Sequence, residues 1–202
     1  IEPQSQLAEK LTSVCFADKF FFCNSGTEAI ESAIKLARKF SFDQGHTNRT
    51  EIITMQNSFH GRSMGALSAT AQKKFHTGFL PLLPGFKYTP FNNIPAVKKA
   101  ISKKTCAIMV EPVQGEGGVN VPSPSYLKEL KSLCQKLDLL LIFDEVQTGF
   151  GRTGKLFAHE LFKVKPDIIT LAKALGGGMA IGAMAGTNRV MKSFIPGTHA
   201  AT

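Results

Sequence analysis

The chain has 202 residues, 43% of them hydrophobic, and its 24 Lys and Arg against 15 Asp and Glu give a formal net charge of +9. This length suits one large domain, and the apolar fraction is high enough for a folded core. A basic chain raises the question of nucleic acid, but the lysines occur in scattered pairs and form no basic stripe with interleaved aromatic residues. We therefore expect solvated surface lysines and no nucleic-acid partner. A mildly positive site for anionic substrates stays open.

Cysteine and histidine spacings predict no metal site. The four cysteines contain no CxxC pair, and the five histidines show no HExxH spacing. No apolar run is long enough to span a membrane, so no membrane partner is expected. The chain begins with Ile1 rather than Met and ends at Thr202 in what reads as a loop. We therefore expect a piece of a longer protein.

Strand and helix patterns alternate along the chain. Helices are expected over 5–16, from the turn at 24–27 to about 40, from 63 onward, and over 94–103, 125–136 and 157–163. Strands are expected at 20–23, 51–56, 106–113, 139–144, 167–171 and 181–186, with an irregular excursion at 75–95. The alternation predicts an α/β fold with a mainly parallel, doubly wound sheet. Ligands of such sheets bind beyond the carboxyl ends of the strands.

The segment Gly149–Gly154 partly matches two nucleotide-binding motifs. It matches GxGxxG, but Asp144, Glu145, Gln147 and Thr148 separate it from the preceding strand, which in the dinucleotide motif runs straight into the first glycine. It also approaches a P-loop, yet Leu156 stands where Ser or Thr must bind magnesium. A P-loop nucleotide-binding module is therefore the disfavoured alternative from another class of protein.

Three polar residues near two strand ends suit a pyridine-ring cofactor. Asp144 ends one apolar strand and offers a carboxylate for a ring nitrogen, and Gln147 follows with an amide for a ring hydroxyl. Lys173 follows the next apolar strand, beside Gly176–Gly178, and offers an amine for a Schiff base. We expect this lysine to be desolvated, with a lowered pKa that makes it the better nucleophile. The alternative is a lysine that extends to the surface.

Two further motifs could complete such a site. Ser25, Gly26 and Thr27 at a helix start offer free N–H groups and hydroxyls for a phosphate. An ordinary helix cap explains the same residues. Phe59 follows a strand and could stack on a planar ring, although it could equally be one more core phenylalanine.

In these motifs the sequence resembles the class III, or ornithine-type, aminotransferases, and among them the acetylornithine aminotransferases. The resemblance covers essentially the whole chain. It rests on CNSGTEAIESAIKLAR, SFHGRSMGALSATAQ, EPVQGEGGVNVP, IFDEVQTGFGRTGKLFAHE and LAKALGGG. It implies the large domain of the fold type I transferases that depend on pyridoxal 5'-phosphate, here over residues 1–202 and truncated at both ends. The N-terminal segment and a C-terminal small domain would be missing.

The resemblance also implies a role for each matching residue. The cofactor would be bound by Ser25, Gly26, Thr27, Phe59, Asp144, Gln147 and Lys173, with Thr202 reaching the phosphate of a neighbouring subunit. Arg62 would bind a substrate carboxylate, and Glu111 and Glu116 would lie near the substrate. Catalysis would depend on Lys173, Asp144 and Glu111. Met179 and Ala180 stand where the family usually has a proline, which puts the rigidity of that turn in question.

The implied activity moves the δ-amino group of N2-acetyl-L-ornithine to 2-oxoglutarate, a step of arginine biosynthesis, in a homodimer with shared active sites. Ornithine, succinylornithine and 4-aminobutyrate remain open as amino donors. A catalytically silent truncation product that acts only in subunit association is a further alternative. The compartment would be the cytoplasm in a bacterium and the mitochondrial or plastid matrix in a eukaryote.

Overall fold

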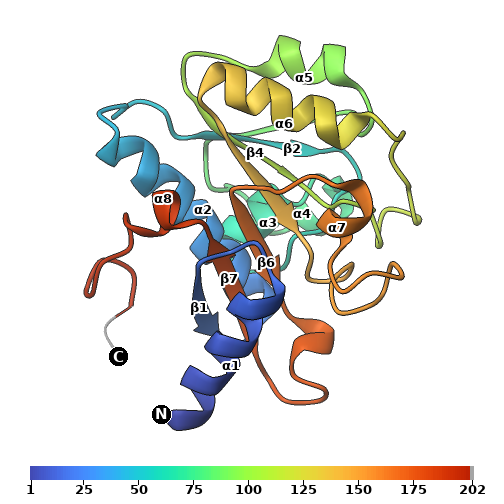
Figure 1. The fold of residues 1–202 in the computed structure, drawn as a ribbon. Helices are drawn as coiled ribbons and strands as arrows, with labels where there is room; N and C mark the ends of the chain where they lie inside the picture. Colours follow the sequence, from blue (N-terminus) through green and yellow to red (C-terminus); the bar gives the residue numbers. More distant parts are fainter. Residues whose placement is uncertain (201–202) are drawn as a thin grey trace.

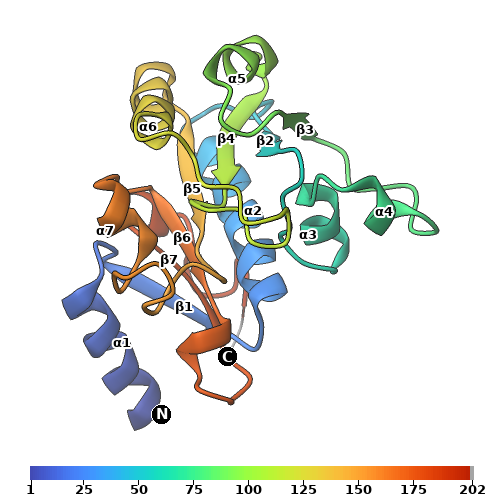
Figure 2. The ribbon, with the colours of Figure 1, turned by 90° about the vertical axis from the view of Figure 1, so that its right-hand side faces the viewer.

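A computed structural model describes residues 1–200, and within them seven strands form one sheet covered by helices on both faces (Figures 1 and 2). The strand order is β1-β7-β6-β5-β4-β2-β3. The strands are β1 (Lys19–Cys23), β2 (Glu51–Met55), β3 (Phe86–Thr89), β4 (Thr105–Val110), β5 (Leu140–Asp144), β6 (Ile168–Leu171) and β7 (Gly182–Gly186). The helices are α1 (Glu2–Val14), α2 (Gly26–Asp43), α3 (Met64–Ala69), α4 (Lys73–His76), α5 (Ile94–Ala100), α6 (Tyr126–Leu137), α7 (Ala158–Phe162) and α8 (Asn188–Met191).

The sheet is mainly parallel, as the sequence predicts. Strands β3, β2, β4, β5 and β6 pair in parallel, whereas β7 pairs antiparallel with both β6 and β1. Strand β1 therefore runs in the same direction as β6, and β7 alone among the described strands is reversed. The carboxyl ends of β1, β2, β4, β5 and β6 consequently meet at one edge of the sheet, where ligands of α/β proteins bind.

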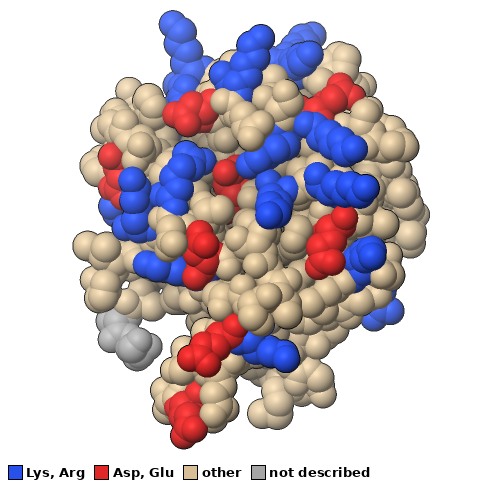
Figure 3. All heavy atoms as spheres, in the orientation of Figure 1, with Lys and Arg blue, Asp and Glu red and all other residues tan. Residues whose placement is uncertain are grey.

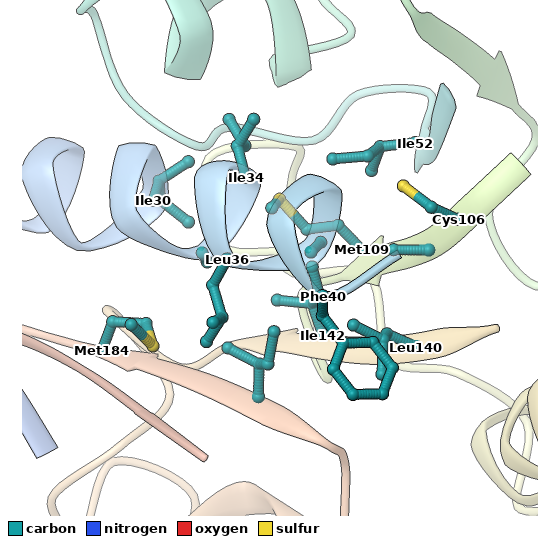
Figure 4. Close-up of a cluster of buried hydrophobic side chains, with 14 of the residues drawn as sticks. Ile30, Ile34, Leu36, Phe40, Ile52, Cys106, Met109, Leu140, Ile142 and Met184 are labelled. Carbon is teal, nitrogen blue, oxygen red and sulfur yellow. The ribbon is translucent and has the colours of Figure 1, made fainter. Parts of the chain in front are cut away.

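The core lies on both faces of the sheet because the central strands are apolar throughout. In β5, Leu140 and Ile142 belong to the cluster under α2, whereas Leu141 and Phe143 face the cluster under α5 and α6. This alternation follows from the two-residue period of a strand. Figure 4 shows the α2 side, where Phe40 and other apolar residues of the helix pack on the strands. The two layers hold the carboxyl edge of the sheet in place.

Several elements differ from the sequence prediction, among them a strand and the ends of a helix and of another strand. The stretch 75–95, expected to be irregular, contains the strand β3, which pairs in parallel with β2 at the edge of the sheet. Its four residues are too few for a recognisable alternation, and prolines flank it on both sides. Helix α2 continues to Asp43 instead of ending near residue 40. The expected strand 106–113 ends at Val110, because Pro112 has no N–H to donate to a ladder.

Charged side chains on the face shown in Figure 3 are mixed, with acidic residues between the Lys and Arg residues. Some pairs are close, such as Lys87 Nζ at 2.8 Å from Glu51 Oε2 and Lys131 Nζ at 3.0 Å from Asp167 Oδ2. None of the helices within residues 1–200 has the length and apolar character needed to cross a bilayer.

Candidate active site

A cavity of about 430 Å³ opens at the carboxyl edge of the sheet. Five chain segments line it, and each follows a different strand: 24–27 after β1, 59–62 after β2, Glu111 after β4, 144–147 after β5 and 172–173 after β6. The turn 179–181 closes one side. Most of the residues that the sequence singled out are therefore brought to one place, although they lie up to about 150 residues apart along the chain.

The segment Ser25–Thr27 begins the long helix α2, which has 18 residues. Ser25 Oγ accepts a hydrogen bond from the Glu28 N–H at 3.3 Å, so the serine is a helix cap as well as a cavity residue. A Cβ at position 26 would lie 2.9 Å from Val146 Cγ1, so a side chain there would have to displace Val146. The exposed N–H groups of a helix start attract anions, and the segment faces the cavity.

Asp144 is 4% exposed and ends β5 at the cavity. Its Oδ1 accepts hydrogen bonds from the Val146 N–H at 3.0 Å and from the Thr170 hydroxyl at 3.1 Å. Its Oδ2 lies 2.7 Å from His60 Nδ1. Hydrogen bonds on both oxygens fix the plane of this carboxylate and aim it into the cavity.

His60 is a cavity residue that the sequence pattern did not single out. It is 3% exposed and lines the cavity, and its Nε2 has no hydrogen-bond partner among the described residues. Burial, the largest influence, lowers the pKa of His60, but the hydrogen bond and charge of Asp144, with the charge of Glu111, outweigh it and raise the pKa above its ordinary value. A histidine directly after a strand was a visible signal. Nothing in the sequence pairs it with an aspartate 84 positions away.

Lys173 follows β6 as the first residue of a short 3₁₀ helix, Lys173–Leu175, and its φ of 41° lies in the left-handed region. Its Nζ donates a hydrogen bond to Gln147 Oε1, a contact that the sequence did not predict. The desolvation that we expected is wrong: Lys173 is exposed, whereas Ala172 before it is buried. The physical reason is that β6 ends at Leu171, so the lysine lies beyond the apolar layer at the open side of the cavity.

Glu111 is 5% exposed, and burial raises its pKa to about 7. The charge of His60 opposes this shift, the charge of Asp144 adds to it, and hydrogen bonds from the N–H groups of Phe59 and Gly115 oppose it. These bonds measure 3.1 Å and 3.4 Å. Glu116, by contrast, is exposed and does not line the cavity. Of the two glutamates singled out by sequence, only Glu111 is placed at the site.

Phe59 and Arg62 line the cavity from the loop after β2. The Arg62 guanidinium lies over two rings, 5.7 Å from the centre of Phe59 and 4.5 Å from that of Phe75. Such cation–π contacts hold an exposed arginine in one place while leaving its N–H groups available. Phe59 also meets Phe75 edge to face at 5.5 Å. The remaining candidate, Thr202, lies outside the described residues.

The motif at 149–154 forms a turn and does not open a helix directly, since α7 begins only at Ala158. The neighbouring Glu145 is 1% exposed, and its carboxylate accepts hydrogen bonds from the N–H groups of Ala158 at 2.5 Å and His159 at 2.8 Å. This carboxylate therefore caps α7. Across residues 1–200 no three His, Cys, Asp or Glu side chains gather as metal ligands.

The known proteins that this chain matches in sequence are aminotransferases. The profile of the family "Aminotransferase class-III" matches residues 1–202. An acetylornithine aminotransferase of Oceanobacillus iheyensis is 49% identical over 202 residues, which are 100% of this chain and 51% of the relative. Another, of Methanocaldococcus jannaschii, is 53% identical over 200 residues, or 99% of this chain and 50% of the relative. A succinylornithine transaminase of Photorhabdus laumondii is 48% identical over 201 residues, 100% of this chain and 50% of that protein.

Solved structures share the fold. The ornithine aminotransferase of Toxoplasma gondii superposes with a TM-score of 0.93 at 37% identity, covering 98% of this chain and 48% of that one. An amine transaminase of an uncultivated Pseudomonas species, solved in a PLP-bound form, has a TM-score of 0.88 at 30% identity over 94% of this chain and 48% of its own. The chain thus spans about half the length of the relatives it matches. On its sequence and its fold, this chain belongs to the class III aminotransferases.

Proposed function

We propose that this chain forms the cofactor-binding domain of a pyridoxal 5'-phosphate-dependent aminotransferase whose amino donor is N2-acetyl-L-ornithine and whose acceptor is 2-oxoglutarate. One observation carries the proposal: a buried carboxylate, an amide and a lysine amine converge on one cavity with a helix start (Asp144, Gln147, Lys173 and Ser25–Thr27). These groups fit the cofactor, because they offer partners for a ring nitrogen, a ring hydroxyl, an aldehyde and a phosphate.

The cofactor, when bound, supplies a ring that withdraws electrons from the bond to be broken. Asp144 would hold a proton at the ring nitrogen, since a carboxylate at about 4 Å from such a charge stabilises it by roughly 4 kcal/mol at an effective dielectric near 20. His60 and Thr170 orient this carboxylate through the hydrogen bonds described above. Lys173 Nζ moves a proton to and from the reacting carbon of the substrate, as a general acid and base. Before the cofactor binds, Gln147 orients Lys173 through its hydrogen bond to Nζ.

Binding and orientation fall to the remaining cavity residues. The N–H groups at the start of α2 would bind the phosphate, and Phe59 would stack on the ring. Arg62 binds a carboxylate of the substrate, an arrangement favoured because its guanidinium is already held over Phe59 and Phe75. Glu111, whose pKa burial raises to about 7, would carry only part of a negative charge in the cavity near neutral pH.

Succinylornithine is the second candidate donor. The relative named for it is 48% identical to this chain, against 49% and 53% for the two acetylornithine aminotransferases compared above, so the match does not separate the two donors. Both donors carry a δ-amine and an acylated α-amine. They differ in the free carboxylate of the succinyl group.

A panel of donors tests this proposal with the natural protein at its full length. We expect kcat/KM with 2-oxoglutarate to be highest for N2-acetylornithine, lower for N2-succinylornithine, and lowest for ornithine and 4-aminobutyrate. Borohydride reduction of the protein loaded with pyridoxal phosphate should attach the cofactor to the peptide that contains Lys173. A preference for succinylornithine would select the second candidate, and a cofactor attached elsewhere would overturn the site.

The proposal includes a homodimer. The loop before β3 exposes three large apolar side chains, Phe79 at 58%, Leu80 at 74% and Leu83 at 37%, which suits a surface that another subunit covers. Thr202, as the family resemblance implies, would then reach the phosphate held by the second subunit. Sedimentation of the natural protein, with and without charged substitutions at Phe79 and Leu80, tests this part. A monodisperse monomer with full activity would refute it.

A further inference from the structure

Gln147 lies between two cavities and next to Gly115. Its side chain lines the cavity of about 430 Å³ and also a second cavity of about 760 Å³, which Gly115 lines too. A Cβ built on Gly115 would lie 2.6 Å from Gln147 Nε2, 2.7 Å from Cδ and 3.1 Å from Oε1. All the heavy atoms of the carboxamide therefore lie next to the space that a side chain at position 115 would occupy. No other residue type could stand there with the amide in its present position.

The backbone conformation at Gly115 does not require glycine, because its φ is not positive. The φ of Gly118, by contrast, is positive. The loop is also firmly tied. The Gly115 carbonyl accepts hydrogen bonds from the N–H groups of Gly118 at 3.1 Å and Val119 at 3.2 Å, and its N–H donates to Glu111 Oε1 at 3.4 Å. An added methyl group would therefore stay in place, and the flexible amide would move.

The structure assigns to Gly115 a positioning role: it holds the Gln147 amide in the orientation that engages Lys173 Nζ and faces the cofactor cavity. The consequence for cofactor binding rests on the proposed function, whereas the consequence for Lys173 does not. A methyl group at position 115 displaces the amide from Lys173, because Gln147 Oε1 is the hydrogen-bond acceptor of that amine. The displaced amide has room in the second cavity, so the fold tolerates the change.

The test is Gly115→Ala in the natural full-length protein, with Gly117→Ala as the matched control from the same loop. A Cβ at Gly117 would lie 2.5 Å from the backbone oxygen of Asn57, which cannot swing aside. We expect Gly115→Ala to keep the melting temperature within about 2 °C of the wild type and Gly117→Ala to lower it by several degrees. Equal losses of stability would show that Gly115 is merely a spacer in the loop and would overturn the inference.

Cofactor affinity supplies the second measurement. Both Gly115→Ala and Gln147→Ala should lose the hydrogen bond between the amide and the cofactor. Loss of one hydrogen bond should raise the dissociation constant for pyridoxal phosphate about tenfold in each variant. The double variant should be no weaker than Gln147→Ala, because the methyl group then meets no amide. A cofactor affinity about a hundredfold lower in the double variant, or an unchanged affinity in Gly115→Ala, would overturn the assignment.

A ligand-free measurement separates this inference from the proposed function. The rate at which an amine-acylating reagent modifies Lys173, followed by peptide mass spectrometry, should change several-fold in Gly115→Ala and not in Gly117→Ala. If the wild type binds no pyridoxal phosphate but this rate changes, the proposed function fails and the positioning role stands. If the wild type binds it and neither rate nor affinity changes in Gly115→Ala, only the positioning role fails.

Discussion

Asp144 and Asp167 are buried aspartates at opposite edges of the same sheet, and their surroundings differ. Asp167 is 8% exposed at the amino end of β6 and lies 3.0 Å from Lys131 Nζ and 3.3 Å from Arg189 Nη2, with the Leu141 N–H at 2.9 Å. Asp144 is 4% exposed at the carboxyl end of β5, without a Lys or Arg ion pair among the described residues, and faces a cavity. The first carboxylate is neutralised by lysine and arginine, and the second is oriented and left open to a ligand.

This difference explains why buried charge alone does not mark a site. A buried carboxylate paired with lysine and arginine, as at Asp167, ties α6 and α8 to the sheet. A buried carboxylate whose neighbours are a histidine and a threonine has no permanently charged partner, and at Asp144 it faces a cavity in which a ligand can reach it. The variants below separate these two roles, because each should affect either turnover or stability.

Lys173→Ala should have the largest effect in the natural full-length protein. Turnover should fall about 10⁴-fold or more, because the proton transfer at the reacting carbon loses its general base. The melting temperature should stay unchanged, since the side chain is exposed. Lys155→Ala, an exposed lysine away from the cavity, is the control and should keep full activity. Residual multiple turnover with a borohydride-reducible cofactor would remove Lys173 from its role.

Asp144→Asn should lower the rate of proton removal from the substrate about 10³-fold, which corresponds to the roughly 4 kcal/mol of lost charge stabilisation. The amide keeps the shape of the carboxylate but not its charge, so the affinity for pyridoxal phosphate should change less than the rate. Stopped-flow measurement of the first half-reaction checks this. A rate within a factor of a few of the wild type would reduce Asp144 to a structural residue like Asp167.

Asp167→Asn should show the converse. Removing the charge leaves Lys131 and Arg189 without their carboxylate partner, and because both cations are partly exposed to solvent, the expected loss in the free energy of unfolding is about 2 kcal/mol. Turnover per folded molecule should remain that of the wild type, because the residue lies at the far edge of the sheet. Urea titration together with active-site counting distinguishes the two. A variant that is stable but slow would contradict the contrast between the two edges.

Glu111→Gln tests a third buried carboxyl group through the pH dependence of stability. The pKa of Glu111 is raised from an ordinary 4.5 to about 7 in the folded protein, so the folded state binds more protons than the unfolded state between these values. The stability of the wild type should therefore fall relative to Glu111→Gln as pH rises from 4.5 to about 7, by up to about 3 kcal/mol. Denaturation curves across this range measure the difference. A difference that is constant with pH would show that the carboxyl group is ionised throughout.

The sequence by itself determined the class of fold and most of the candidate site. Apolar runs such as 139–144 and 167–171 are long and regular enough to predict strands, and the polar residues at their ends were expected at one edge because parallel strands end together. Asp144, Gln147, Lys173 and the 25–27 segment meet there as predicted. Local pattern is sufficient for these features because each residue's place follows from the strand that it ends.

Only the tertiary structure decided which long-range neighbours meet. The His60–Asp144 hydrogen bond, the exposure of Lys173 and the contact of Gly115 with Gln147 depend on how far each loop extends past its strand. Strand β3 was missed because its four residues become a strand by pairing with β2, not by their own pattern. Glu116 shows the same limit, since a residue of a family motif can point away from the cavity while Glu111 in that motif lines it. Contacts between distant segments are set by packing, and no local period in the sequence encodes them.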